Sequence, residues 1–347
     1  MLPRPPPYSN LCQNTLEDDV AKIIQTDKAG EAALALLDAG DIVAIPTETV
    51  YGLAGDATNG VAVAKIFEAK GRPRFNPLIA HVCDMAMAER IAVFDPLSRQ
   101  LAEAFWPGPL TLVLKLRADA GIHPLVTAGL ETIALRMPRG FASVLIARLG
   151  RPLAAPSANS SGRISATTAQ AVADDLGARV PLVVDGGATP VGVESTILKV
   201  EDGTLRLLRP GGVSAEEIEA LTGRTVERLA AKAAIEAPGM LESHYAPRAA
   251  VRLNAETIDA GEALLAFGAV APGGATPVAM LNLSAAGDLR EAASNLFSHL
   301  QALDRSGAKT IAVQPIPTTG LGDAINDRLS RAAAPRGPAR NDNRLPT

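Results

Sequence analysis

The chain is organised around the segment KGRPRFNPLIAH, which runs from Lys70 to His81. Three cations, Lys70, Arg72 and Arg74, fall close together, and no carboxylate inside the segment neutralises them. Arginine offers a planar fork to phosphate oxygens, and lysine offers a compact point charge. A solvent-exposed basic turn explains the three cations equally well when they are considered alone. The neighbouring residues are therefore needed to distinguish an anion-binding site from an ordinary turn.

The flanking residues predict a helix before the cations and a strand after them. Apolar residues recur among polar ones over 59–69, which is typical of a short helix that ends at Lys70. Residues 78–82 are typical of a buried strand. Elsewhere in this part of the chain, helices are predicted over 28–39, 95–105 and 168–177, and strands over 42–45, 110–116, 132–137, 153–155, 182–185, 193–197 and 205–209. The alternation predicts an α/β fold.

Composition limits the class of protein. The 347 residues exceed the ~100–200 of one domain, so two domains are expected. A net charge of −4 and 3% aromatic residues argue against a polycation that coats nucleic acid and against base-stacking platforms. Cys12 and Cys83 are far apart and indicate neither a disulfide framework nor a zinc site. Without an apolar run of ~18 residues or a signal-peptide pattern, the sequence predicts a cytoplasmic protein with no membrane contact.

The domain boundary is predicted at 231–249, where helical and strand periods both disappear. This linker carries a histidine and a tyrosine and could fold over a site. Residues 28–230 form the predicted catalytic domain. Residues 250–335 predict a smaller, doubly wound, Rossmann-like α/β domain. Residues 1–27 and 336–347 are rich in residues that disfavour a packed core and predict a disordered extension and tail.

Cations and neutral hydrogen-bonding side chains cluster at the strand ends and turns of the first domain, whereas nucleophile motifs do not occur there. Such a site suits reactions that depend on positioning and charge stabilisation, foremost nucleotidyl or phosphoryl transfer. The absence of a GxxxxGK[ST] segment argues against a P-loop enzyme. The candidate side chains are Lys70, Arg72, Arg136 and Arg209, the hydroxyls of Thr47, Thr49, Thr132, Ser157, Ser195 and Thr196, and the amides of Asn76 and Asn159.

Two of these features have an alternative structural interpretation. The hydroxyl-rich loop 46–53 follows a buried strand, where hydroxyls often only close turns or cap helices. Arg136 lies inside an otherwise apolar strand, where a cation is costly unless it is paired. It is either neutralised by a buried acid or directed at a ligand's carboxylate or phosphate, and we favour the ligand.

Six motifs in this order closely resemble the threonylcarbamoyl-AMP synthase family, the YrdC-like proteins. They span roughly 28–212, and the pair formed by Lys70-x-Arg72 and Ser157-x-Asn159 is similar to that family's signature. The linker and the trailing α/β domain look like the long, two-domain form of the family. The motifs are PTETVYGL at 46–53, KGRP at 70–73, PLI at 77–79, WPGPLT at 106–111, PSAN at 156–159 and VESTI at 193–197.

The resemblance implies a nucleotidyltransferase that condenses L-threonine, bicarbonate or CO₂, and ATP into threonylcarbamoyl-adenylate and releases pyrophosphate. Its fold would be a twisted mixed α/β sheet with a basic concave site. The product would pass to a threonylcarbamoyl-transfer machinery that modifies tRNA at position 37, beside the anticodon. The resemblance also allows a direct contact with tRNA, as double-stranded RNA binding. Mg²⁺ is expected with ATP, although no carboxylate cluster in the sequence indicates a metal site of the protein's own.

The resemblance also implies roles for individual residues. Lys70 and Arg72 would be catalytic. Thr167 is an alternative to Ser165. His81 can also be explained as a hydrogen-bonded histidine at the end of a strand. In the linker, Leu241-Glu242-Ser243 stand where the family often has a basic residue. L-threonine would contact Thr49, His81, Arg136, Ser157 and Ser195, and ATP would contact Lys70, Arg72, Asn76, Thr132, Asn159, Ser165, Arg209 and Tyr245.

Two other functions compete with this one. A carbamoyl-transfer role in hydrogenase maturation also uses YrdC-like domains, but these usually accompany acylphosphatase and zinc-finger modules. A noncatalytic RNA-binding module would use the basic concavity, and its binding would depend on salt and survive the loss of ATP.

Overall fold

The computed structural model describes residues 21–228, 236–240, 243–269 and 272–335. The predicted tail at 336–347, residues 1–20 of the predicted extension and part of the predicted linker lie outside these ranges. Within them, no helix is both long and apolar enough to cross a membrane. The prediction of a disordered extension is wrong for its last residues. Strand β1 (Lys22–Gln25) pairs in parallel with β8 (Leu182–Asp185), and helix α1 begins at Thr26.

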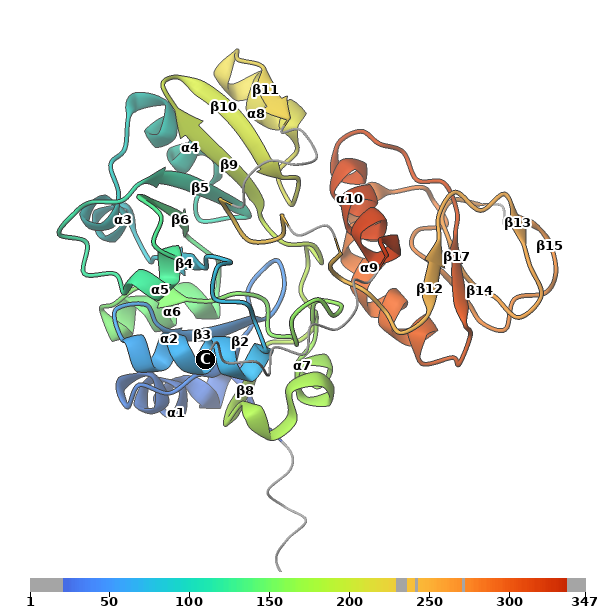
Figure 1. Ribbon diagram of the computed structural model, residues 1–347, viewed down its shortest axis with the longest axis horizontal. Coiled ribbons are helices and arrows are strands. Elements are labelled where there is room, and N and C mark those ends of the chain that lie inside the picture. The colour runs from blue at the N-terminus through green and yellow to red at the C-terminus, as the bar shows by residue number, and fades with distance from the viewer. Residues whose placement is uncertain (1–20, 229–235, 241–242, 270–271, 336–347) are drawn as a thin grey trace, which may run out of the picture.

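The first domain is built on a mixed sheet that, in the described residues, has eleven strands in the order β1-β8-β2-β3-β7-β4-β6-β5-β9-β10-β11 (Figure 1). The remaining strands are β2 (Val43–Ile45), β3 (Gly52–Asp56), β4 (Ile79–His81), β5 (Leu110–Lys115), β6 (Thr132–Arg136), β7 (Leu153–Ala154), β9 (Thr196–Glu201), β10 (Thr204–Arg209) and β11 (Val226–Arg228). The twisted mixed sheet confirms the α/β fold expected for this domain.

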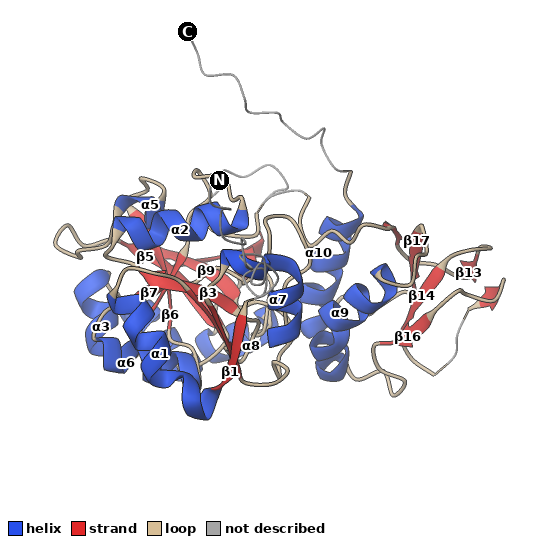
Figure 2. Cartoon of the chain, turned by 90° about the horizontal axis from the view of Figure 1, so that it is seen from below, coloured by secondary structure: helices blue, strands red, loops and turns tan. Residues whose placement is uncertain are grey.

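Helices cover both faces of this sheet. Figure 2 shows α2 and α5 on one side and α1, α3 and α6 on the other. The helices are α1 (Thr26–Asp38), α2 (Gly60–Lys70), α3 (Met85–Ile91), α4 (Pro96–Phe105), α5 (Pro124–Thr127), α6 (Phe141–Leu149), α7 (Ala169–Leu176), the 3₁₀ turn η1 (Gly177–Arg179) and α8 (Ala215–Thr222). Their apolar faces and the sheet enclose one large core.

Helix α2 has local signals at both ends that place the basic segment. The side chain of Asn59 caps its N-terminus by accepting from the backbone N–H groups of Val61 and Ala62. Its C-cap, Gly71, adopts a left-handed conformation with φ 58°, which glycine reaches at little cost. The chain therefore turns sharply after Lys70 and continues toward β4.

Two stretches differ from the predicted elements. Strand β3 begins inside the predicted loop 46–53, and its sequence, GLAGD, lacks the β-branched residues that mark most strands. Strand β9 begins at Thr196, so Val193–Ser195 precede the strand instead of forming its start. Backbone pairing with β2 and β7 makes β3 a strand, and a local reading of the sequence does not include those partners.

The second domain has a parallel four-stranded sheet in the order β12-β17-β14-β16. Its elements are β12 (Ala250–Arg252), β13 (Thr257–Ile258), β14 (Ala263–Ala266), β15 (Gly273–Gly274), β16 (Met280–Asn282), α9 (Leu289–Asp304), β17 (Thr310–Val313) and α10 (Leu321–Ala333). Both α9 and α10 pack on the face toward the first domain (Figure 1). The α/β prediction is confirmed, but the doubly wound arrangement is wrong. The opposite face packs on Ala255 and Ile258, close to the short β13–β15 pair.

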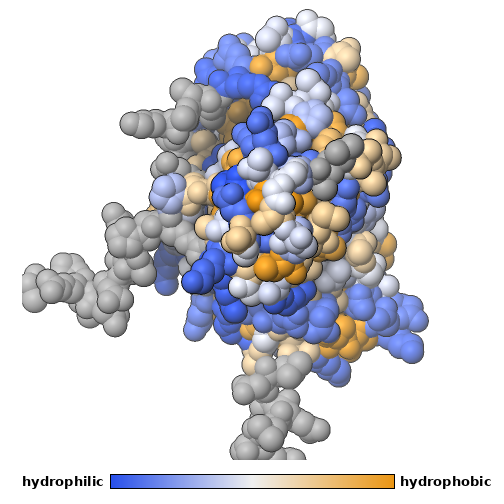
Figure 3. All heavy atoms as spheres, turned by 90° about the vertical axis from the view of Figure 1, so that its right-hand side faces the viewer, coloured by the Kyte–Doolittle hydropathy of each residue, from blue (hydrophilic) through white to orange (hydrophobic). Residues whose placement is uncertain are grey.

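The two domains share apolar contacts. Val50, Val193 and Tyr245 belong to the same buried cluster as Phe297 and other residues of α9 and α10. The outward face of the second domain, in contrast, carries apolar residues only in small groups among polar ones (Figure 3). That is an ordinary protein surface. The face that carries α9 and α10 is thus the one that joins the second domain to the rest of the molecule.

Candidate functional site

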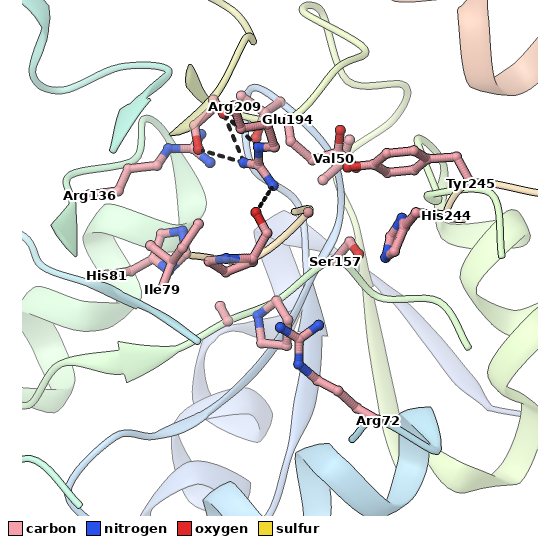
Figure 4. Close-up of a pocket in the computed structure, with 16 residues that line it drawn as sticks. Val50, Arg72, Ile79, His81, Arg136, Ser157, Glu194, Arg209, His244 and Tyr245 are labelled. Carbon is pink, nitrogen blue, oxygen red and sulfur yellow. Dashed lines mark hydrogen bonds between the residues drawn. The ribbon is translucent and has the colours of Figure 1, made fainter. Parts of the chain in front are cut away.

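A small cavity of about 40 Å³ lies where several loops of the large sheet meet the linker. Figure 4 shows Arg136 and His81 on one side of it, His244 and Tyr245 on the other, and Ser157 between them. A larger groove, of about 1260 Å³ between α7 and α9, contains none of the predicted site residues. The small cavity is lined by Thr49, Val50, Arg72, Ile79, His81, Arg136, Ala155, Pro156, Ser157, Glu194, Ser195, Arg209, Pro238, Gly239, His244 and Tyr245.

His81 and Arg136 are side-by-side partners on the parallel strands β4 and β6. Burial lowers the pKa of His81 to about 3, and the nearby charge of Arg136 adds to the effect, so the imidazole is neutral. Arg136 donates from Nε to the carbonyl of Gly108 and forms an ion pair with Glu48, with 2.8 Å between Nη2 and Oε1. The buried acid that we considered the less favoured explanation is therefore present, although Arg136 also lines the cavity.

The three hydroxyls predicted to hold threonine also line the cavity. The hydroxyls of Thr47 and Thr49 lie 2.9 Å apart, and Thr47 donates to the carbonyl of Val50, which orders the loop 46–53. Ser157 pairs with Gly52 across an isolated bridge. The hydroxyl of Ser195 lies 2.7 Å from that of Thr111. The hydroxyl-rich loop thus both closes a turn and faces the cavity.

Two of the three cations of the basic segment are buried, which rules out a solvent-exposed turn for them. Lys70 is 3% exposed, and its ammonium donates to the carbonyls of Ser157 and Asn159. Arg72 is 8% exposed and donates to the carbonyls of Asn76 and Pro77. Arg74 alone of the three is exposed. The interpretation as a plain turn is therefore correct only for Arg74.

Burial shifts the pKa of both buried cations. The pKa of Lys70 falls to about 7, chiefly through burial and then through the charge of Arg72. The pKa of Arg72 falls to about 10, through burial and then through Arg209. Burial away from any anion disfavours the charged form of each side chain. An approaching phosphate would therefore stabilise the charged form of both. Lys70 itself does not line the cavity but lies behind Ser157 and Asn159.

The predicted ATP residues are only partly brought to the cavity. Arg72, Arg209 and Tyr245 line it, whereas Lys70, Asn76, Thr132, Asn159 and Ser165 do not. Thr132 opens β6 at the end opposite Arg136, roughly 13 Å along the strand.

Several buried polar atoms beside the cavity have no hydrogen-bond partner within the described residues. They include both side-chain polar atoms of Asn76 and Oδ1 of Asn159. Asn76 and Asn159 are each only 1% exposed. Buried polar groups are normally satisfied, so unpaired ones near a cluster of cations indicate that a polar ligand supplies the partner.

Two lining residues with ionisable side chains were not among the predicted site residues. Glu194 lies between the quoted Val193 and Ser195, and its Oε1 accepts from Ser165 Oγ at 2.5 Å. His244 stands beside the predicted Tyr245, and burial lowers its pKa to about 3. A search of each quoted motif for buried carboxylates would have found Glu194 and also Glu48, the partner of Arg136.

Residues of the linker form part of the cavity wall. The backbone of Pro238 accepts from Arg209, and Gly239, with φ 84°, approaches so closely that an added Cβ would lie 2.7 Å from Arg209 Cδ. Small-molecule sites usually measure ~300–1000 Å³. The cavity of about 40 Å³ is well below that range.

Comparisons with known proteins identify the family. The family model described as "Telomere recombination", named for Sua5, YciO and YrdC, matches residues 35–211. The model for the "Threonylcarbamoyl-AMP synthase, C-terminal domain" matches residues 213–334. The chain is 41% identical to the threonylcarbamoyl-AMP synthase of Bacillus subtilis, covering 88% of this chain and 92% of that protein. It is 39% identical to that of Pyrococcus abyssi, covering 86% and 92%.

Solved structures from the same family have the same fold as this chain. A crystal structure of P. abyssi Sua5 complexed with L-threonine superposes with a TM-score of 0.80 at 35% identity, covering 90% of this chain and 97% of that one. A second P. abyssi Sua5 structure, in which a histidine and a tyrosine are replaced by alanine, superposes equally well, at 90% and 96% coverage. The similarity spans both domains.

Proposed function

The chain belongs to the Sua5/YrdC family of threonylcarbamoyl-AMP synthases, and we propose that its cavity condenses L-threonine, bicarbonate or CO₂, and ATP into threonylcarbamoyl-adenylate. One observation supports this most strongly. All five residues expected to contact L-threonine line the same cavity as Arg72 and Arg209. The product serves the threonylcarbamoyladenosine modification of tRNA, and the enzyme is a nucleotidyltransferase of the cytoplasm.

The residues suit a sequence of charge-stabilised steps. Arg136 binds the threonine carboxylate, and the neutral imidazole of His81 hydrogen-bonds without adding a second cation. The neutral threonine amine adds to CO₂, and its nitrogen loses one proton to the solvent as the carbamate forms. A carbamate oxygen then attacks the α-phosphorus of ATP, and the bond to the bridging oxygen breaks to release pyrophosphate. Arg72, Arg209 and Lys70 stabilise the negative charge that builds up on the phosphates.

Magnesium fits this site as an ion that arrives with ATP. Mg²⁺ prefers phosphate oxygens, waters and one or two carboxylates. Glu194, the carboxylate that lines the cavity, already holds Ser165 with one oxygen and Arg328 with the other. The described residues contain no group of three or more histidine, cysteine or acidic side chains that could hold a metal ion. When bound, the ion would neutralise phosphate charge.

An RNA-binding module remains the weaker candidate. Such a module would need its basic side chains at the surface, where a phosphate backbone can reach them. Lys70 and Arg72, the cations that suggested it, are 3% and 8% exposed. A direct contact with tRNA at another surface, and the transfer machinery that receives the adenylate, remain predictions.

The function is tested by pyrophosphate release from ATP and Mg²⁺. We expect release to require both L-threonine and bicarbonate, because the attacking oxygen belongs to a carbamate made from both. Each is omitted in turn, and mass spectrometry checks for threonylcarbamoyl-adenylate. Release that continues without threonine or without bicarbonate would contradict the proposal, as would the absence of release from folded protein.

ATP binding is expected to take up a proton at pH 8. In the protein without ATP, Lys70 has a pKa of about 7 and is mostly neutral at that pH. The phosphates of bound ATP should raise this pKa, so that Lys70 becomes charged. The uptake should be roughly 0.5–1 proton, falling toward zero below pH 6, where Lys70 is already charged. Calorimetric titration of ATP in two buffers of different ionisation enthalpy measures it. Lys70→Met is the control, and equal uptake by that variant would refute the assignment.

A further inference from the structure

The second domain reaches the cavity through one buried arginine. Glu194 is 6% exposed and uses both carboxylate oxygens, with Oε1 accepting from Ser165 and Oε2 accepting from Arg328 Nε at 2.8 Å. Arg328 lies on α10 and is completely buried. Its Nη1 donates to Asp327 at 2.6 Å. An ion pair between residues 134 positions apart thus joins a cavity-lining carboxylate to the other domain.

The same arginine supports the linker tyrosine. The Arg328 Cζ atom lies 5.2 Å from the centroid of the Tyr245 ring, a cation–π distance. The other ring contacts are a stacked Phe297 of α9, with centroids 5.4 Å apart, and an edge contact with His244. Tyr245 has φ 61°, a conformation that a bulky residue keeps only when its surroundings hold it there. Arg328 and Phe297, both of the second domain, provide two of those contacts.

The charge on Arg328 determines the state of Glu194. Burial alone would raise the pKa of Glu194, but the charges of Arg328 and then Arg209, together with the Ser165 hydrogen bond, hold it at about 2. Figure 4 shows Glu194 beside Arg209. Without Arg328, the Glu194 carboxylate would draw Arg209 toward itself as a counter-charge. The same carboxylate would also repel a phosphate in the cavity.

We propose that Arg328 is a positioning residue of the catalytic site, supplied by the second domain. By pairing with Glu194 and supporting Tyr245, it leaves Arg209 available to the phosphates of ATP. This role is distinct from simply holding the domains together, which surface pairs such as Arg228 with Asp323, 2.7 Å apart, also do. The proposal rests on ATP binding by the proposed site.

The test is direct ATP binding by the full-length chain, measured by calorimetry and accompanied by steady-state kinetics. Arg328→Met is expected to weaken ATP binding about tenfold or more, because the ion pair with Glu194 and the cation–π contact with Tyr245 are both lost. The KM for ATP should rise by a larger factor than kcat falls. Arg228→Met, which removes an interdomain ion pair at the surface, is the matched control and should bind ATP like wild type. A folded Arg328→Met protein that matches this control overturns the proposal.

A second variant separates charge from packing. In Glu194→Gln the carboxylate is gone, so adding Arg328→Met removes only the contact with Tyr245 and should change ATP affinity less than threefold. If the double variant loses as much affinity as Arg328→Met, or does not fold, Arg328 is only structural and the proposal is wrong. Should Arg328→Met alone fail to fold, the comparison of Glu194→Gln with the double variant decides in the same way. Wild type that binds no ATP would contradict the proposed function instead.

The pH dependence gives a signature that packing alone would not produce. In Arg328→Met the pKa of Glu194 should rise, because burial is no longer opposed by the arginine. As pH falls through that raised pKa, the carboxylate becomes neutral and the defect relative to wild type should shrink. The quantity compared at each pH is the ratio of the ATP affinity of wild type to that of Arg328→Met. A ratio is used because other charged or titratable groups face Glu194, and both proteins contain them. These groups are Lys70, Arg209, Asp327, His244 and Tyr245. A ratio that does not change with pH argues against the proposal.

Discussion

Lys70→Ala is expected to slow threonylcarbamoyl-adenylate formation by about 10²–10³-fold, the range seen when one preorganised donor to a developing charge is removed. Lys70 ends α2 and donates to the carbonyls of Ser157 and Asn159. It therefore both orders the segment that carries Ser157 and adds positive charge beside the phosphate site. The loss should appear mainly in kcat, because the charge matters most when pyrophosphate leaves.

The fold should survive this change. The substitution removes two hydrogen bonds, worth ~1 kcal/mol each or somewhat more. It also removes a cation whose burial is unfavourable, as the lowered pKa of Lys70 shows. The two effects oppose each other, so the melting temperature should change by only a few degrees. Lys65→Ala is the control on the same helix, because Lys65 pairs with Asp41 at the surface. Adenylate formation at the wild-type rate in Lys70→Ala would refute the assigned role.

The sequence predicted those parts of the site that are encoded locally. The helix that ends at Lys70, the strand β6 and the motif around Ser157 each depend on neighbouring residues, and the structure has them where expected. Burial of Lys70 was not predictable in this way. It arises because the chain passes from α2 through Gly71 under the loop at 157–159, which belongs to a distant part of the sequence.

The features that the sequence did not reveal depend on long-range pairs. Glu48 and Arg136 are 88 positions apart, and Glu194 and Arg328 are 134 apart, so neither pair leaves a spacing that can be recognised. The second domain shows the same limit. Its alternating strands and helices predicted an α/β unit correctly, but they did not reveal that α9 and α10 both lie on the face toward the first domain.

Arg136→Met is expected to lower the affinity for L-threonine by 10²-fold or more, since a charge-assisted pair to the substrate carboxylate is lost. ATP affinity should stay within about threefold, because Arg136 and His81 lie on the side of the cavity opposite Tyr245 (Figure 4). Arg139→Met, a nearby exposed arginine, is the matched control. Calorimetric titration of L-threonine and of ATP separates the two effects.

The same substitution removes the partner of a buried acid, and this loss has to be separated from loss of substrate binding. Glu48 is 9% exposed and would be left without Arg136, at a cost of up to ~3–5 kcal/mol of folding free energy. Pairing the change with Glu48→Gln removes the uncompensated charge, so the double variant should recover most of the stability in a denaturant titration. It should not recover threonine affinity, because the carboxylate still lacks its cation. If the double variant binds L-threonine like wild type, Arg136 serves only to neutralise Glu48, and the threonine carboxylate must be bound by another group.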